Sequence, residues 1–191
     1  TEVYAFSGFM TALVIYLIMR WSEKMHNSDH VIYLIFISYI IGLATGLHLL
    51  NLLTIPFIGL IIYFSIGKIS TKNLILTITL SLISFFGIQS FIIQGLPQIT
   101  ASIGLIGLML LIISLIAFTV YSIKSRKAFS SIFLSSTLLI IIGYSTYFSI
   151  FIRSGQDPNI DENNPETIAE AISYLNRDQY GQMTILPRKF N

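Results

Sequence analysis

The feature that most constrains this chain is a long stretch without carboxylates: no Asp or Glu lies between Asp29 and Asp157. The stretch is apolar almost throughout, and its few basic residues fall in short gaps between apolar runs. A soluble domain of this length could not hide so much apolar surface in one small core. Only 10% of the 191 residues are charged, whereas about a quarter are charged in soluble domains. The sequence therefore predicts an all-α protein that lies in a lipid bilayer.

A membrane-spanning helix needs about 20 mostly apolar residues, which allows the apolar runs to be divided into spans. The run from Val31 to Gly67 is too long for one span and has to contain a hairpin. We place the hairpin near His48, Asn51 and Pro56, because Pro begins or breaks a helix and Asn favours turns. This division predicts about six transmembrane helices, at Val3–Arg20, Val31–His48, Asn51–Gly67, Leu74–Gln94, Ser102–Ile123 and Ser130–Arg153.

The basic residues alternate between successive gaps, which predicts the orientation of the spans. Those near the first, third and fifth gaps are Arg20, Lys24, Lys68, Lys72, Lys124, Arg126 and Lys127. The other two gaps, Leu49–Leu50 and Gly95–Ala101, contain no charge. Because cytoplasmic loops carry an excess of Lys and Arg, the three basic gaps are predicted to face the cytoplasm. Everything after Arg153 then faces outward.

Within the second predicted span, Gly42 and Gly46 form a GxxxG pattern. Small residues at this spacing are typical of membrane helices whose backbones approach closely. We interpret the pattern as ordinary helix packing.

Residues 154–191 differ from the bundle at residues 1–153 and are predicted to begin an extracytoplasmic domain. A polar, acidic loop from Ser154 to Asn164 comes first. A helix is predicted over about 165–177, with Asn164 as its N-cap and Pro165 in its first turn. Its apolar residues recur at helical spacing: Ile168, Ala171, Ile172 and Leu175. We expect the chain to be an internal fragment, since Thr1 is no initiator residue and no signal peptide is evident.

Polar residues near the predicted outer ends of the helices are the candidates for a binding cavity. Glu2 adds a carboxylate at the start of the first span, and His48 and Asn51 lie at the hairpin of the next two. Polar groups in membrane proteins often mark functional sites, so these three residues are predicted to line one cavity. The alternatives are a solvated charge for Glu2 and a structural hydrogen bond for His48.

The acidic loop has a spacing similar to the opening of a calcium-binding loop, with acidic or amide residues at Asp157, Asn159, Asp161 and Asn163. Two required positions differ, because Glu162 replaces the glycine and Ile168 replaces the final glutamate. We therefore predict a turn-rich linker and no metal site. Cysteine is absent, the net charge is only +2, and no phosphate-binding loop is evident. Nothing here indicates a nucleic-acid partner.

Four stretches occur in order along the chain: Thr1–Ala5, Gly42–Pro56, Asp157–Pro165 and Ser173–Gly181. Together they resemble a large bacterial family of polytopic membrane proteins catalogued as a domain of unknown function. That family is similar to the eukaryotic transmembrane protein O-mannosyltransferases, which belong to the GT-C class of glycosyltransferases. The relatives often have two adjacent prolines where this chain has Pro158 and Asn159.

The resemblance implies a bacterial inner-membrane enzyme that moves a sugar from a polyprenyl-phosphate donor to an extracytoplasmic protein. The implied acceptor is a Ser or Thr hydroxyl, and the lipid-linked sugar is the only cofactor-like molecule implied. GT-C enzymes carry a catalytic carboxylate in their first external loop, which we expect upstream of this chain. The implied cavity residues are Glu2, Tyr4, His48, Asn51 and Arg153. The implied family-motif residues of the tail are Asp157, Asp161, Glu162, Asn163, Asn176, Arg177 and Tyr180.

A non-enzymatic polytopic protein is the alternative, such as a transporter, a flippase for lipid-linked sugars or an assembly subunit. It is supported by the lack of any constellation in this chain that performs chemistry alone, since a fold does not determine an activity.

Overall fold

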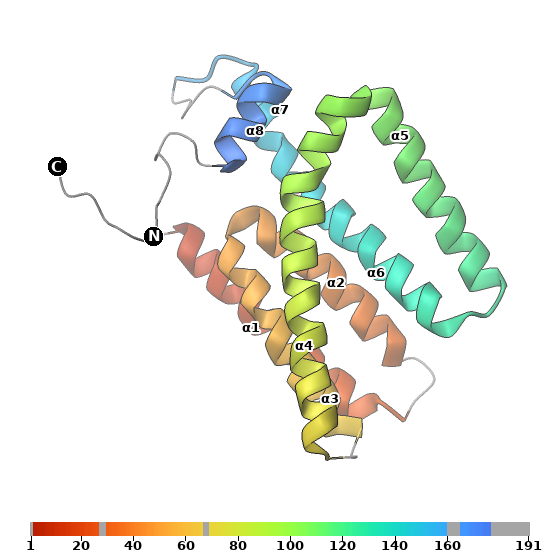
Figure 1. The fold of residues 1–191 in the computed structure, drawn as a ribbon. Helices are drawn as coiled ribbons and strands as arrows, with labels where there is room; N and C mark the ends of the chain where they lie inside the picture. The colour runs from red at the N-terminus through yellow and green to blue at the C-terminus, as the bar shows by residue number, and fades with distance from the viewer. Residues whose placement is uncertain (1, 27–29, 67–68, 160–164, 177–191) are drawn as a thin grey trace, which may run out of the picture.

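The computed structural model describes residues 2–26, 30–66, 69–159 and 165–176 (Figure 1). These residues form helices and short connections, and no strand occurs among them. Five helical segments are long and apolar enough to cross a membrane. The predicted all-α membrane protein is therefore confirmed, as expected for apolar segments whose backbone groups must be satisfied internally.

The first three spans pack against one another. They comprise α1 (Glu2–Lys24), α2 (His30–Leu47) and the pair of a short 3-10 helix, η1 (Leu49–Leu53), with α3 (Thr54–Ile66). Helix α1 packs against both α2 and α3. Its buried residues recur every three or four positions, at Met10, Val14, Leu17, Ile18 and Trp21. This spacing places them on one helix face, which α1 turns toward its neighbours.

A single apolar segment of 54 residues follows, from Thr71 to Lys124. It consists of α4 (Thr71–Gly87), a π-helix, η2 (Ile88–Gln94), and α5 (Gly95–Lys124). At 1.5 Å per residue it would be about 80 Å long if straight, far beyond the hydrocarbon thickness of about 30 Å. The chain instead turns back inside α5 at Gly104, whose φ of 71° and ψ of 175° are accessible to glycine. Figure 1 shows the resulting arch from α4 over into the descending part of α5.

The arch corrects one expectation from the sequence. Residues 95–101, predicted as a gap between spans, are helical, and the reversal lies at Gly104. The prediction placed the gap at an uncharged stretch that contains Pro97. This proline lies in the first turn of α5, where a helix tolerates a residue without a backbone N–H. Because the fourth of the five segments reverses at Gly104, the described residues contain six apolar helical stretches. That each stretch crosses the bilayer stays a prediction.

Helix α6 (Ala128–Ser145) returns against α2, and η3 (Thr146–Phe148) and α7 (Ser149–Ser154) continue it. The α2–α6 contact depends on glycines. A Cβ added at Gly42 would clash with the carbonyl oxygen of Ile140, and one added at Gly143 would clash with the backbone of Tyr39. Gly46 faces Tyr147, whose Cβ would lie 3.4 Å from an added Cβ. The predicted close approach at the GxxxG pattern is therefore confirmed.

The last described helix, α8 (Ile168–Asn176), packs against α5 and η2. Its N-cap is Thr167, whose Oγ1 accepts a hydrogen bond from the Glu170 backbone N–H at 3.2 Å. The Glu170 carboxylate accepts in return from the Thr167 backbone N–H at 2.8 Å. This reciprocal pair is a capping box, and α8 begins three residues later than predicted; the predicted N-cap, Asn164, lies outside the described residues.

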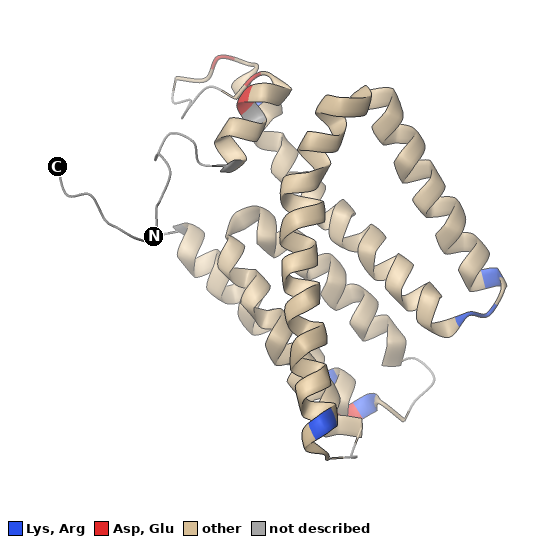
Figure 2. Ribbon diagram, viewed as in Figure 1, with Lys and Arg blue, Asp and Glu red and all other residues tan. Residues whose placement is uncertain are grey.

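Charged residues lie near the ends of the helices (Figure 2). The described Lys and Arg residues other than Arg153 gather at one end of the bundle, with Glu23 bound to Arg20 at 2.6 Å. The remaining described acidic residues lie toward the opposite end. The long apolar faces of the helices run between these two ends, as a hydrocarbon layer requires.

Candidate functional site

The predicted candidates Tyr4, His48 and Asn51 come together where the start of α1 meets the turn between α2 and α3. The ring centroids of Tyr4 and His48 lie 5.5 Å apart, with their planes tilted by 50°. Tyr4 is 70% exposed, whereas Asn51 is only 2% exposed. Since α1 runs from this point to Lys24, the site lies at the end of α1 opposite the basic residues. The backbone of Glu2 lies here too, at the first position of α1.

Asn51 is a buried link between α1 and the turn. Its Oδ1 accepts a hydrogen bond from Thr11 Oγ1 at 2.8 Å. Its Nδ2 donates to the backbone oxygens of Ala44 and His48, at 2.9 Å each. Nδ2 also lies 3.1 Å from Ser7 Oγ. These contacts occupy both ends of the amide, so Asn51 holds the turn in place against α1.

Ser7 and Thr11 were not predicted as site residues. Together with Tyr4 they are spaced three and four residues apart, which places all three on one face of α1. That spacing was readable in the sequence, but Ser and Thr are common in membrane helices and usually bond to their own helix. Only the position of Asn51 opposite this face distinguishes them from the others.

His48 caps η1 through its side chain, and this bond decides which ring nitrogen carries the proton. The Nδ1 atom accepts a hydrogen bond from the Leu50 backbone N–H at 3.2 Å. In a neutral imidazole, an accepting Nδ1 leaves the proton on Nε2. No described residue accepts a hydrogen bond from Nε2, and the ring is half-buried. His48 therefore presents an N–H donor beside the exposed ring of Tyr4.

Arg153 is exposed on α7, and its side chain makes no hydrogen bond or ion pair with a described residue. Of the family-motif residues in the tail, Asp157 is exposed in a turn that follows α7, with a φ of 49°. Asn176 ends α8. The others lie outside the described residues: Asp161, Glu162, Asn163, Arg177 and Tyr180.

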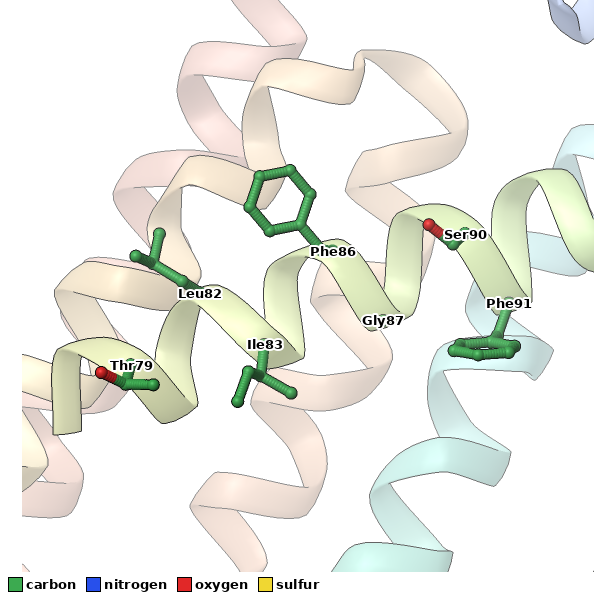
Figure 3. Close-up of a pocket in the computed structure, with 7 residues that line it drawn as sticks. All are labelled: Thr79, Leu82, Ile83, Phe86, Gly87, Ser90 and Phe91. Carbon is green, nitrogen blue, oxygen red and sulfur yellow. The ribbon is translucent and has the colours of Figure 1, made fainter. Parts of the chain in front are cut away.

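A second feature is an apolar groove of about 510 Å³ on the outer side of α4 and η2. All of its lining residues come from this one continuous stretch: Thr79, Leu82, Ile83, Phe86, Gly87, Ser90 and Phe91 (Figure 3). Phe86 and Phe91 are 60% and 75% exposed, so the groove opens outward along the apolar surface. Its lining suits a hydrocarbon chain and offers few partners to a polar ligand.

The described residues contain no cluster of metal-ligating side chains. No three His, Cys, Asp or Glu side chains gather there in a way that could hold a metal ion. The site at Tyr4 and His48 instead offers aromatic surface, an N–H donor and a phenol hydroxyl. Such groups bind sugars and phosphate oxygens through stacking and hydrogen bonds.

Comparison with known proteins points to the part of the chain that builds this site. Residues 1–73 match the family described as the protein O-mannosyl-transferase TMEM260 N-terminal domain. The matched range contains α1, α2, η1 and α3, and with them Tyr4, His48 and Asn51. The searches of curated proteins and of solved structures found no match. The similarity to O-mannosyltransferases expected from the sequence is thereby confirmed for these 73 residues.

Proposed function

We propose that this chain is part of an integral-membrane glycosyltransferase of the GT-C class. In the proposed reaction, a mannose-like sugar passes from a polyprenyl-phosphate donor to a Ser or Thr hydroxyl of an extracytoplasmic protein. The observation that carries the proposal is the match over residues 1–73. This range includes both rings of the Tyr4–His48 pair and the hydrogen bond from the Leu50 N–H that holds the His48 ring.

The proposed transfer forms a bond between the acceptor oxygen and the anomeric carbon of the sugar. It breaks the bond between that carbon and the phosphate oxygen of the donor, and the acceptor proton goes to a general base. We assign the base to a carboxylate in a loop that precedes Thr1, as the GT-C resemblance implies. The backbone of Glu2 lies at the start of α1, at the same end.

His48 is assigned to the phosphate that leaves. Negative charge grows on the phosphate oxygens as the bond breaks, and a fixed hydrogen-bond donor stabilises that charge. The bond from the Leu50 N–H to Nδ1 keeps Nε2 protonated, so the donor is already oriented before the lipid arrives. Asn51 fixes the same turn through the backbone oxygen of His48, and so acts as a positioning residue.

The donor's hydrocarbon chain needs an apolar surface open to the bilayer, and we propose the groove on α4 and η2 for this role. Its walls include the exposed rings of Phe86 and Phe91, and Gly87 lies between them in sequence. An isoprenoid chain that lies there would bury mostly apolar surface, since Thr79 and Ser90 are the two polar residues among those that line the groove.

We further propose that the chain resides in a bacterial inner membrane with the Tyr4–His48 end and the tail on the extracytoplasmic side. The basic residues at the opposite end of the bundle support this orientation, because Lys and Arg are enriched on the cytoplasmic side. The acceptor protein and the lipid-linked sugar would then meet at the outer face.

The test uses the full-length protein that contains this chain, reconstituted in liposomes with polyprenyl-phosphate mannose and a Ser/Thr-containing peptide. His48→Asn is the informative variant, because Asn can still accept the Leu50 N–H as a cap but does not place a donor where Nε2 lies. We expect the free energy of unfolding to stay unchanged and the rate of sugar transfer to fall at least tenfold. Removing one hydrogen-bond donor to a developing oxyanion lowers the rate by up to about 10²–10³. His26→Ala is the matched control, because His26 is exposed at the opposite end of α1 and is expected to leave transfer unchanged.

Two results would contradict the proposal. Sugar transfer by His48→Asn at the wild-type rate would remove His48 from the reaction. Movement of the lipid-linked sugar across the bilayer by the wild-type protein, without transfer to the peptide, would instead support a flippase.

A further inference from the structure

The turn between α5 and α6 carries three cations in four residues: Lys124, Arg126 and Lys127. All three are exposed. Figure 2 shows them at a corner of the bundle, apart from the acidic residues. This turn plays no part in the proposed transfer reaction, because it lies at the end of the bundle opposite the Tyr4–His48 site.

The basic turn has no protein counter-charge among the described residues. Among the described residues, the single ion pair joins Arg20 to Glu23, and both residues lie on α1. No carboxylate lies in the sequence between Asp29 and Asp157, so none can come from the neighbouring helices of this stretch. The Lys127 ammonium instead lies 5.6 Å from the centre of the Tyr121 ring, a cation–π contact that leaves its positive charge in place.

The backbone of the turn is held by hydrogen bonds, so the three cations are presented on a fixed scaffold. The Lys127 N–H donates to the Ser122 oxygen at 3.1 Å, and the Arg126 N–H donates to the Ile123 oxygen at 3.0 Å. This pair of bonds is the Schellman ending of a helix, which needs a left-handed residue. Arg126 takes that position with a φ of 52°, where glycine is the usual residue. The three cations are therefore presented on a turn of defined backbone conformation.

Exposed aromatic rings flank the cations. Tyr121 is 61% exposed and Phe129 is 83% exposed. The Phe129 and Phe133 rings stack with their centroids 6.4 Å apart on the outer side of α6. Cations bordered by exposed aromatic rings are typical of the boundary between the headgroups and the acyl chains of a bilayer.

We propose that the α5–α6 turn binds the headgroup of an anionic phospholipid. Lys124, Arg126 and Lys127 contact the negatively charged phosphate of the headgroup, while Tyr121 and Phe129 lie at the level where the acyl chains begin. The guanidinium of Arg126 suits a phosphate, because it offers several N–H donors in one plane.

The experiment measures lipid binding to the purified full chain in detergent, by native mass spectrometry, with phosphatidylglycerol and with phosphatidylcholine. Arg126→Gly removes one cation and relieves the left-handed backbone, so the variant is expected to fold at least as well as the wild type. Its affinity for phosphatidylglycerol is expected to fall about fivefold, the effect of one basic residue near an anionic surface. The triple variant Lys124→Gln, Arg126→Gln, Lys127→Gln is expected to lose at least about tenfold. A matched control, Arg20→Gln, Lys24→Gln, Lys72→Gln, removes the same charge from the same end and is expected to keep the wild-type affinity.

Three outcomes would overturn the assignment. The first is equal affinity for phosphatidylglycerol and phosphatidylcholine in the wild type. The second is an equal loss in the triple variant and its control, which would mean that only total charge matters. The third is unchanged binding by Arg126→Gly in a protein that remains folded.

Discussion

Replacing Asn51 with alanine is expected to destabilise the bundle by about 2–3 kcal/mol, from the hydrogen bonds that the side chain makes. The amide links to Thr11, to the Ala44 oxygen and to the His48 oxygen at 2.8–2.9 Å, with Ser7 at 3.1 Å. Each such bond contributes about 0.5–1.5 kcal/mol net, and bonds between membrane helices average about 0.6 kcal/mol.

The expected loss is smaller than a simple sum because the partners keep other bonds. The Ala44 oxygen also accepts the His48 N–H at 2.9 Å, and the His48 oxygen also accepts the Asn51 N–H at 3.1 Å. Thr11 can turn its hydroxyl back to its own helix. The expected cost therefore lies at the low end of the range that the lost hydrogen bonds allow, and the small cavity left by the shorter side chain adds to it.

The assay is the free energy of unfolding in mixed micelles, measured by titration with a denaturing detergent. Asn73→Ala is the matched control, because Asn73 is exposed on α4 and its removal is expected to change stability by less than about 0.5 kcal/mol. A double-mutant cycle with Thr11→Val isolates the 2.8 Å bond and is expected to show a coupling of about 0.6 kcal/mol. An effect of Asn51→Ala no larger than that of the control would refute the reasoning that this amide holds the site together.

Three further predictions follow from local geometry. Gly42→Leu is expected to cost more than about 3 kcal/mol in unfolding free energy because any Cβ there meets the α6 backbone, whereas Gly8→Leu, with open space around it, is expected to be nearly neutral. Gly104→Ala is expected to cost about 1–3 kcal/mol, measured as a lower midpoint of thermal unfolding, since a φ of 71° with a ψ of 175° is strained for any residue with a Cβ. Hydrogen bonds from the Thr167 backbone and side chain lower the pKa of Glu170 below its usual value. At a pH above the usual pKa of a glutamate, these bonds stabilise the start of α8 in full. The stabilisation is lost as the pH falls through the lowered pKa of Glu170. In Thr167→Ala the backbone N–H bond remains and only the hydroxyl bond to the carboxylate is lost, so the pKa of Glu170 is expected to rise part of the way back toward its usual value in an NMR titration. An unchanged pKa would contradict the bond from the Thr167 hydroxyl.

Much of the helix content could be predicted because the bilayer limits the choices. A long apolar segment in hydrocarbon has to satisfy its own backbone, so the apolar runs had to be helices. Helix ends and reversals were harder, because a proline and an uncharged gap near Pro97 are compatible with a loop and with a continuing helix alike. The true reversal depends on the φ of Gly104, which no local pattern marked among the glycines of this chain.

The candidate site was predictable in part. Glu2, His48 and Asn51 were expected near one another from their places at predicted helix ends, and the family resemblance added Tyr4. The structure brings Tyr4, His48 and Asn51 together. The contribution of Ser7 and Thr11 was not predictable, because it depends on a contact between residues 40 or more positions apart. The Nδ1 bond of His48 likewise depends on the extended backbone of that one residue, with a φ of −157°.

The sequence by itself determined that this chain lies in a membrane, that it is helical, and that one end of the bundle is basic. Composition suffices for these properties, because the solvent around a segment is decided by transfer free energies that add along the chain. The tertiary structure decided which helix faces meet: Gly42 against the α6 backbone, Asn51 against α1, and the basic turn at an exposed corner. Lipid is as apolar as the helix surfaces, so no hydrophobic force selects these contacts. Close packing and a few hydrogen bonds select them, and both exist only once the partners are in place.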